Sequence, residues 1–116
     1  MFLPSANTKV YLALESTDMR KSINGLSILV SEYLELDPFT GHLFAFCNRK
    51  RNMVKILYWD RNGFCLWHKR LEKHRFKWPA SKSEMMTIGR HELSWLLDGL
   101  EISQKEAHTP LKYSTV

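Results

Sequence analysis

The sequence predicts an α+β domain, in which an antiparallel β-meander of about four to five strands carries a long helix from the N-terminal half on one face and a shorter C-terminal helix. Two observations lead to this prediction. Three strand-like runs follow His42, joined by short polar connectors, and one connector contains Asn-Gly, a strong hairpin signal. Apolar residues recur at spacings of three and four on both sides of these runs, which favours a helix on each side.

Length and composition fit one folded unit. The chain has 116 residues, 44% of them apolar, which is too short for two good cores but sufficient for one. We assign residues 1–102 to this domain and residues 103–116 to a polar, flexible tail. The N-terminal apolar run is too short for a signal peptide, and no window approaches the roughly 20 apolar residues of a membrane span. We therefore expect a cytoplasmic protein without a membrane partner.

The elements follow in order along the chain. Residues 9–14 fit a first strand, and Thr17 or Asp18 can then cap a helix. One stripe of this helix is apolar and comprises Met19, Ile23, Leu26, Val30 and Tyr33. The runs 42–47, 53–59 and 64–71 predict the meander, and residues 75–79 are a candidate short edge strand. A flexible stretch at 80–84 leads to the second helix, whose apolar stripe comprises Leu93, Leu96, Leu97 and Leu100.

Two predicted registers sort the meander into two faces. A regular DRNG loop places Lys55 opposite His68, and a five-residue NRKRN loop places Cys47 opposite Met53. Successive strand residues point to opposite sides, so one face is apolar and is expected to carry the long helix. That face comprises Phe44, Phe46, Val54, Ile56, Tyr58, Trp67 and Leu71. The other face mixes aromatic and basic side chains, namely Trp59, Phe64, Leu57, Leu66, Leu43, Lys55, His68 and Arg70.

The positive charge is concentrated in one part of the chain. Residues 49–77 contain ten Lys or Arg against two acids, a net charge of +8, whereas the remainder carries a net charge of −3. Cations bind phosphates by releasing counterions, and aromatic faces stack on unpaired bases, so this mixture favours nucleic acid. The predicted nucleic-acid-binding residues are Arg49, Lys50, Arg51, Lys55, Trp59, Phe64, His68, Lys69, Arg70, Arg75 and Lys77. A solvated outer face that only aids solubility is the alternative interpretation.

The sequence offers no persuasive catalytic or metal site. A metal-dependent nuclease could in principle use Asp60, Glu72 and His74, but Asp60 has an ordinary explanation as a turn residue and Glu72 as an ion-pair partner. The predicted registers send Cys47 and Cys65 to opposite faces, and the short spacing typical of zinc ligands is missing. We therefore predict a protein that is not an enzyme and has no cofactor and no metal, with two reduced thiols.

Several ordered blocks resemble a known family. TDMRKSINGL (17–26), DPFTGHLFAF (37–46), KILYWDRNGFCLWHKRLE (55–72) and RFKWP (75–79) resemble the TnpB accessory proteins of the IS66 group of bacterial insertion sequences, as does ELSWLLDGL (92–100). The resemblance covers roughly residues 8–102. It implies a small protein that transposition requires beside a larger transposase, to which strand cleavage and joining belong. It supplies no catalytic residues.

Two functional hypotheses follow from these observations. In the first, the protein binds DNA at the ends of the element or in the transposase–DNA complex. In the second, it is a protein–protein adaptor for the transposase, or for the other accessory protein of the same element, and does not bind DNA directly. Its docking surfaces are TDMRK (17–21), with Asp18, Met19 and Arg20 as the predicted partner-binding residues, and the aromatic patch. The sequence does not indicate the oligomeric state.

Overall fold

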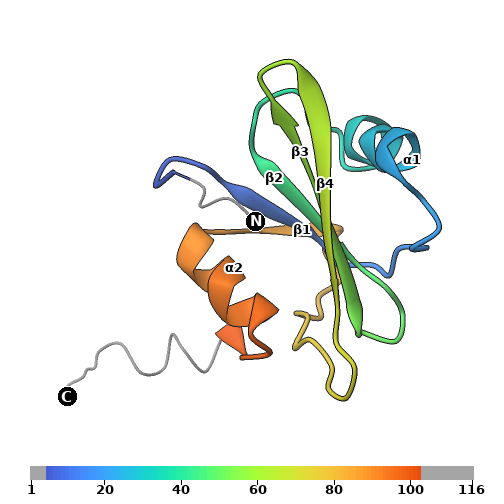
Figure 1. Cartoon of the computed structure of the whole chain (residues 1–116), viewed down its shortest axis with the longest axis vertical. Helices are drawn as coiled ribbons and strands as arrows, with labels where there is room; N and C mark the ends of the chain where they lie inside the picture. The colour runs from blue at the N-terminus through green and yellow to red at the C-terminus, as the bar shows by residue number, and fades with distance from the viewer. Residues whose placement is uncertain (1–4, 103–116) are drawn as a thin grey trace.

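The computed structural model describes residues 5–102 and contains a five-stranded mixed sheet with strand order β4-β3-β2-β1-β5 (Figure 1). The strands are β1 (Val10–Ala13), β2 (Leu43–Cys47), β3 (Met53–Asp60), β4 (Gly63–Arg70) and β5 (Met85–Ile88). The helices are α1 (Ile23–Ile28), which continues as the π-helical segment η1 (Leu29–Tyr33), and α2 (Arg90–Leu97). The predicted α+β class is therefore confirmed, and the predicted tail at 103–116 lies outside the described residues.

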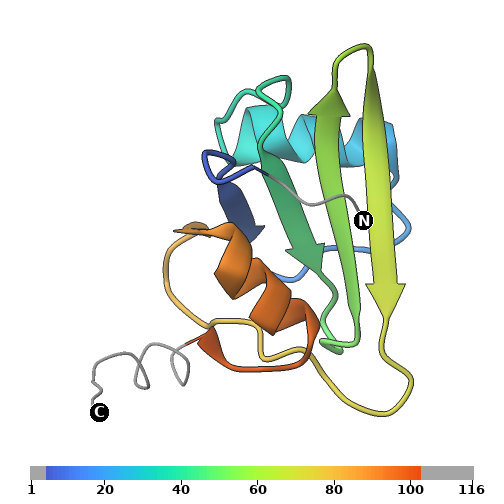
Figure 2. The same ribbon diagram turned by 60° about the vertical axis from the view of Figure 1, so that its left-hand side comes forward.

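The sheet is an antiparallel meander only in part. Strands β2, β3 and β4 form the meander, but β1 lies parallel to β2 and is joined to it through α1. Strand β5 adds to the other side of β1 in antiparallel orientation and forms an edge that the sequence analysis did not anticipate. Figure 2 shows β2, β3 and β4 side by side, with the chain after β4 running below the sheet toward β5.

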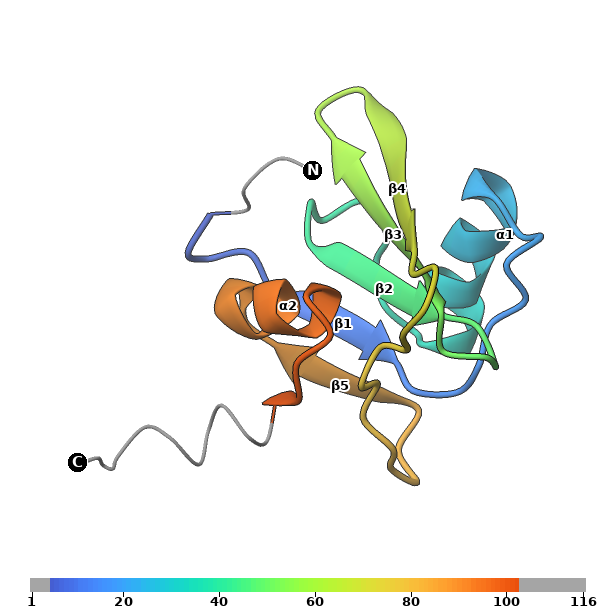
Figure 3. The same cartoon turned by 60° about the horizontal axis from the view of Figure 1, so that its bottom comes forward.

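Residues 75–79, the candidate edge strand, form no strand. Phe76 and Trp78 are buried in the core instead, and Trp78 Nε1 donates a hydrogen bond to the carbonyl oxygen of Ala13 (2.9 Å). This segment lies on the same side of the sheet as α2, as Figure 3 also shows, and covers the sheet rather than extending it.

Neither helix is as long as the apolar stripe in the N-terminal half of the chain predicts. The first spans Ile23 to Tyr33 and is closed by Glu35 in the left-handed region (φ 56°), with Leu36 N–H bonded to the Val30 carbonyl (2.9 Å). The predicted start near residue 18 is wrong: Thr17 N–H bonds to the Cys47 carbonyl, and the carbonyls of Met19 and Lys21 accept from Lys55 Nζ, so backbone groups of this segment bond to the sheet. Among residues 5–102, no helix has the length and apolar character needed to cross a membrane.

The second helix matches its predicted stripe at three of four positions. Leu93, Leu96 and Leu97 are buried, whereas Leu100 lies beyond the helix and is 47% exposed. The Glu92 carboxylate accepts the Gly89 N–H at the start of the helix (2.8 Å).

The core has two layers because each face of the sheet is covered by a helix (Figure 1). Helix α1 and η1 contribute Leu26 and Val30 to one layer, which also contains Phe44, Phe46 and Leu57. Helix α2 and the segment after β4 cover the other face. The buried residues of this second layer are Val10, Leu12, Leu14, Leu43, Ala45, Cys47, Val54, Ile56, Phe76, Trp78, Ile88, Leu93, Leu96 and Leu97.

One of the two predicted registers is correct and the other is shifted by one residue. The β3–β4 pairs, including Lys55 with His68, agree with the prediction. In the β2–β3 hairpin, however, Cys47 pairs with Val54 rather than with Met53. Asn48 continues the ladder, since its N–H bonds to the Met53 carbonyl (3.1 Å), so the loop has one residue fewer than predicted.

This shift exchanges the faces of β2 relative to β3. Phe44 and Phe46 lie on the face of Leu57, not on that of Ile56, and the first helix packs on this face rather than on the predicted one. Leu43 moves to the opposite face. Cys47 and Cys65 consequently share a face, and both are free thiols, as predicted.

Candidate nucleic-acid interface

The predicted binding face of the hairpin is not an open sheet surface. Trp59, Phe64, Lys55, His68 and Arg70 do share one face of β3 and β4, as the register predicts. Helix α1 and η1 pack on that same face, against Leu57, Phe64 and Leu66. The contribution of each side chain therefore depends on what covers it.

Lys55 is engaged inside the protein. Its Nζ donates hydrogen bonds to the carbonyl oxygens of Met19 (2.8 Å) and Lys21 (2.9 Å), which lie in the connection between β1 and α1. A half-buried ammonium group with two backbone acceptors is held in place and has little freedom to contact a phosphate. The prediction that Lys55 binds nucleic acid is not supported by this arrangement.

Lys69 has a similar internal contact on the opposite face. Its Nζ donates to the carbonyl oxygen of Leu97 (2.9 Å), in the last turn of α2. A cation at this position complements the negative end of the helix dipole and satisfies a carbonyl that has no partner within the helix. Lys69 therefore attaches α2 to the sheet.

The predicted exposed aromatic patch is a three-ring cluster. Trp59 and Phe64 are half-buried, and Phe39 packs against both, with ring centroids 5.1 Å and 5.2 Å away. Phe39 itself is 57% exposed and is positioned by its N–H, which donates to Asp37 Oδ1 (2.9 Å). The sequence reasoning missed Phe39, although the Asp-Pro-Phe turn signal is visible in the chain.

The loop between β2 and β3 presents two of its three cations to solvent. Asn48 Oδ1 accepts from the N–H groups of Asn52 and Met53 (both 3.0 Å), which fixes the loop, and Arg49 and Lys50 are exposed. Arg51 has a positive φ of 61° and is only half-exposed, since its Nη1 is buried, without a hydrogen-bond partner among the described residues.

Arg51 also affects the neighbouring thiol. Burial raises the pKa of Cys47, and the Arg51 guanidinium partly opposes this rise. Arg51 therefore belongs partly to the interior, whereas Arg49 and Lys50 are available to a ligand.

Two basic stretches that are separate in the sequence meet at one end of the sheet. Leu71 N–H bonds to the Asn52 carbonyl (2.8 Å), and Phe76 N–H bonds to the Arg51 carbonyl (2.7 Å), so the segment after β4 lies beside the β2–β3 loop. The groove described below brings residues 16–19 opposite residues 48–50, and Lys55 Nζ binds the carbonyl oxygens of Met19 and Lys21, so the segment that contains Arg20 and Lys21 lies on this side of the sheet. We call the resulting surface the basic end, and it comprises the exposed residues Arg20, Lys21, Arg49, Lys50, Arg70, Lys73, Arg75 and Lys77.

The carboxylates within the basic end are already paired with arginines. Asp18 Oδ2 lies 2.7 Å from Arg20 Nη2, and Glu72 Oε2 lies 3.2 Å from Arg70 Nε. The hydrogen bonds from Arg20 lower the pKa of Asp18 to about 2, so this carboxylate stays ionised at neutral pH. His68 is exposed on the same side as Arg70, two residues earlier in β4.

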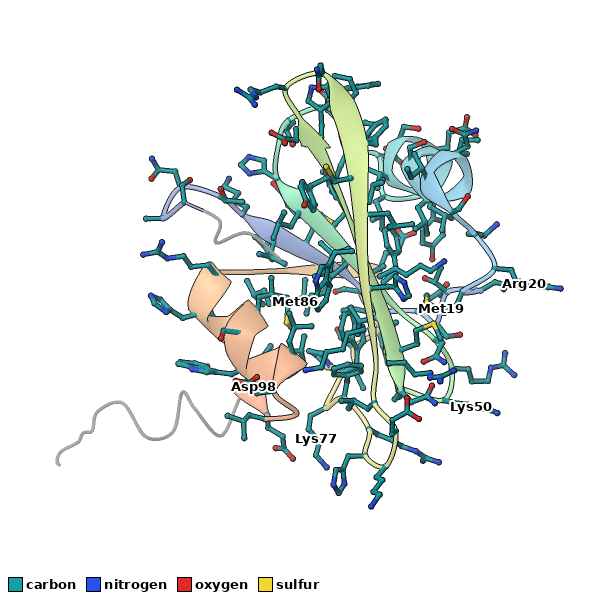
Figure 4. The ribbon with its side chains drawn as sticks, viewed as in Figure 1. Met19, Arg20, Lys50, Lys77, Met86 and Asp98 are labelled. Carbon is teal, nitrogen blue, oxygen red and sulfur yellow. The ribbon has the colours of Figure 1, made fainter. Side chains whose placement is uncertain are left out.

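A groove of about 560 Å³ lies between the connection after β1 and the β2–β3 loop. One wall is formed by Ser16, Thr17, Asp18 and Met19, and the other by Asn48, Arg49 and Lys50. The predicted partner-binding segment and the predicted DNA-binding loop therefore face each other across one groove. Figure 4 shows Met19, Arg20 and Lys50 at the same edge of the molecule.

The candidate nuclease residues are not brought together. Asp60 ends β3 at the hairpin turn, whereas Glu72 and His74 follow the far end of β4, eight residues along the strand. At about 3.3 Å per residue, this separation is on the order of 25 Å. Within the described part of the chain, no three His, Cys, Asp or Glu side chains are grouped in a way that could hold a metal ion.

Comparison with known proteins identifies the family. Two uncharacterized proteins of Sinorhizobium fredii are similar along most of their length. The protein y4hO is 39% identical over 100 residues, which cover 85% of this chain and 87% of the relative. The protein y4jC is 31% identical over 115 residues, which cover 97% and 98%. No solved structure matches. The family model of IS66 Orf2-like proteins matches residues 8–107, and the chain therefore belongs to the IS66 Orf2-like family.

Proposed function

We propose that this protein is a non-catalytic accessory protein of DNA transposition that binds DNA through the basic end. Membership of the IS66 Orf2-like family associates the chain with the transposition machinery of an insertion sequence. The DNA would be an end of the element or the DNA held by the transposase. The observation that carries the proposal is the gathering of exposed cations from three separate segments at one end of the sheet.

The charge balance of this surface suits a polyanion. Exposed lysines and arginines outnumber the carboxylates, and Asp18 and Glu72 are each paired with an arginine of the same surface. Phosphates bound by such cations release counterions, so affinity falls steeply as the salt concentration rises. The proposal differs from the sequence-based one, because Lys55 and Lys69 are engaged internally and the aromatic pair lies at the opposite end of the β3–β4 hairpin.

The test is an anisotropy titration of a labelled element-end duplex across a series of salt concentrations, with a scrambled duplex for comparison. The variant Arg75→Gln/Lys77→Gln removes two exposed cations from the basic end and should reduce the slope of log affinity against log salt by about 2. A matched control, Lys9→Gln/Arg61→Gln, removes two exposed cations from the other end of the sheet. Equal slopes for both variants and the wild type would overturn the proposal.

An adaptor function is the second candidate, and it is favoured by the aromatic cluster. Phe39 is more than half exposed beside Trp59 and Phe64, at the end of the sheet away from the basic end. Aromatic side chains are enriched in protein–protein interfaces. Co-purification of the transposase from a nuclease-treated lysate, and its loss with Phe39→Ala, would favour this candidate. Loss of the complex upon nuclease treatment would favour shared DNA.

A further inference from the structure

The groove between residues 16–19 and 48–50 is lined by Met19 and by polar or charged residues, among them Arg49 and Lys50. Its volume of about 560 Å³ lies in the range of pockets that hold small ligands, which is roughly 300–1,000 Å³. The residues on its two walls come from the connection after β1 and from the loop after β2, more than 25 positions apart in the sequence. The tertiary structure alone creates this site.

Four side chains of the groove carry donors that have no internal acceptor. The hydroxyl groups of Ser16 and Thr17 and the cationic groups of Arg49 and Lys50 make no side-chain hydrogen bond or ion pair within residues 5–102. A lysine contributes three donors and an arginine five, and each hydroxyl contributes one. Unless a ligand supplies the acceptors, these groups are satisfied only by water.

The carboxylate and amide oxygens of the groove already accept hydrogen bonds. Both carboxylate oxygens of Asp18 accept hydrogen bonds from Arg20, at distances of 2.7 Å to 3.1 Å. Asn48 Oδ1 accepts from two backbone N–H groups of its own loop. Because Arg20 offsets the charge of Asp18, the unpaired charge in the groove is positive and comes from Arg49 and Lys50. Together with two hydroxyl groups that can donate, this charge suits an anion with several acceptor oxygens.

The walls are fixed before any ligand arrives. Thr17 N–H donates to the Cys47 carbonyl (2.8 Å), and Lys55 Nζ holds the carbonyls of Met19 and Lys21. Asn48 Nδ2 donates to Asn52 Oδ1 (2.7 Å) across the base of the opposite wall. A site built from walls that are already ordered loses less conformational entropy when it binds a ligand.

We propose that this groove is a phosphate-binding site and that it binds a phosphate group of the DNA strand. Arg49 and Lys50 supply the charge from one wall, and Ser16 and Thr17 donate hydrogen bonds from the other. The DNA part of this inference rests on the proposed function, whereas the anion site does not. The remaining cations of the basic end supply the long-range attraction, and the groove fixes the position of one phosphate.

The test uses backbone amide chemical shifts measured with two probes, inorganic phosphate and the element-end duplex. In the wild type, inorganic phosphate should shift the amide signals of residues 16–19 and 48–50. Ser16→Ala, a change at an exposed position that leaves the charge unaltered, should weaken phosphate binding several-fold by removing one donor to an anion. Arg49→Gln/Lys50→Gln should abolish the shifts, and the matched charge change Arg75→Gln/Lys77→Gln should leave them in place.

The titration with the duplex shows whether the groove binds a phosphate of DNA or only free phosphate. Ser16→Ala should weaken duplex binding without changing its salt dependence, because it removes no charge. If the wild type binds the duplex but phosphate leaves the groove amides unshifted and Ser16→Ala binds like the wild type, the groove inference is overturned and the proposed function stands. If phosphate shifts these amides but no duplex binds at any salt concentration, the proposed function and the DNA source are overturned and the anion site stands.

Discussion

Lys55 Nζ lies 2.8 Å from the carbonyl oxygen of Met19, although the two residues are 36 positions apart in the chain. The same ammonium group binds the Lys21 carbonyl, so one lysine of β3 holds the second half of the connection between β1 and α1 against the sheet. The helix begins at Ile23 rather than at the predicted cap near Asp18, and the Met19 carbonyl, which an earlier start would pair with the Ile23 N–H, accepts from Lys55. This contact also places Met19 in the wall of the groove.

Replacing Lys55 should therefore reduce stability. Lys55→Met keeps the apolar stem but leaves two carbonyl oxygens without their donor, and we expect the free energy of unfolding to fall by about 1–3 kcal/mol. Denaturant unfolding measures this change. Lys73→Met is the control, because Lys73 is exposed and surface substitutions usually alter stability by no more than about 0.5 kcal/mol. Equal unfolding free energies for the two variants would show that the contact contributes nothing.

The contact of Lys69 with Leu97 should stabilise the end of α2. Lys69→Met removes a cation from the helix C-terminus and the donor to its last turn, and we expect a cost of about 1 kcal/mol. The effect should be local, so amide hydrogen exchange should become faster in α2 than in α1. The same control, Lys73→Met, should leave exchange in α2 unchanged. Uniform acceleration in both helices would argue against a specific attachment.

Tyr33 should give the protein a stability change at high pH. Its hydroxyl donates to Glu15 Oε1 (2.8 Å), and this hydrogen bond raises the pKa of Tyr33 from 10.0 to about 12. Because the pKa is higher in the folded state, the contribution to stability is complete below pH 10 and is lost as the pH rises from 10 to about 12. The tyrosinate absorbance of the wild type, minus that of Tyr33→Phe, reports this titration.

Glu15→Gln serves as the control for the tyrosine. Without the carboxylate, the pKa of Tyr33 should move back toward its ordinary value. A titration of Tyr33 near 10 in the wild type would contradict the role of Glu15.

Phe39 should contribute to stability despite its exposure. Phe39→Ala removes two ring contacts, each worth about 0.5–1.5 kcal/mol, and leaves Trp59 and Phe64 more open to water. We expect the free energy of unfolding to fall by about 1–2 kcal/mol, which thermal unfolding measures. Ile28→Ala is the matched control, since Ile28 is similarly exposed on α1. A loss no greater than that of the control would mean that the cluster is not formed in solution.

The two hairpins differ in how well their strand registers can be predicted from the sequence. The DRNG loop predicts the β3–β4 register correctly, because turn chemistry and strand pattern are local properties of the chain. The NRKRN loop misleads by one residue, because Asn48 pairs with Met53 and uses its own side chain to close the loop. A one-residue error reverses a face, so the wrong side of the sheet was expected to carry the long helix.

The residues of the candidate site could likewise be predicted from the sequence only where the signal is local. The sequence identifies the basic segment and the opening block that contains Asp18 and Met19, since charge and motif are visible in the chain itself. It cannot reveal that Lys55 and Lys69 are engaged with backbone carbonyls, because their partners lie 28 to 36 positions away. Nor does it reveal Phe39 as the third ring, although a turn signal precedes that residue.

What the sequence alone determined is the α+β class, the family, the buried centres of the two helix stripes (Leu26 and Val30; Leu93, Leu96 and Leu97), the β3–β4 register and the concentration of positive charge. Each of these depends on neighbouring residues or on local periodicity. The ends of the stripes at Met19, Tyr33 and Leu100 were predicted wrongly, since Met19 precedes the helix and Tyr33 and Leu100 are exposed. The tertiary structure decided which cations remain available, placed β1 beside β2 and β5 beside β1, and brought residues 16–19 opposite residues 48–50. These features depend on pairings between distant segments, whose free energy comes from burying both faces of one sheet at once, and no local pattern encodes that choice.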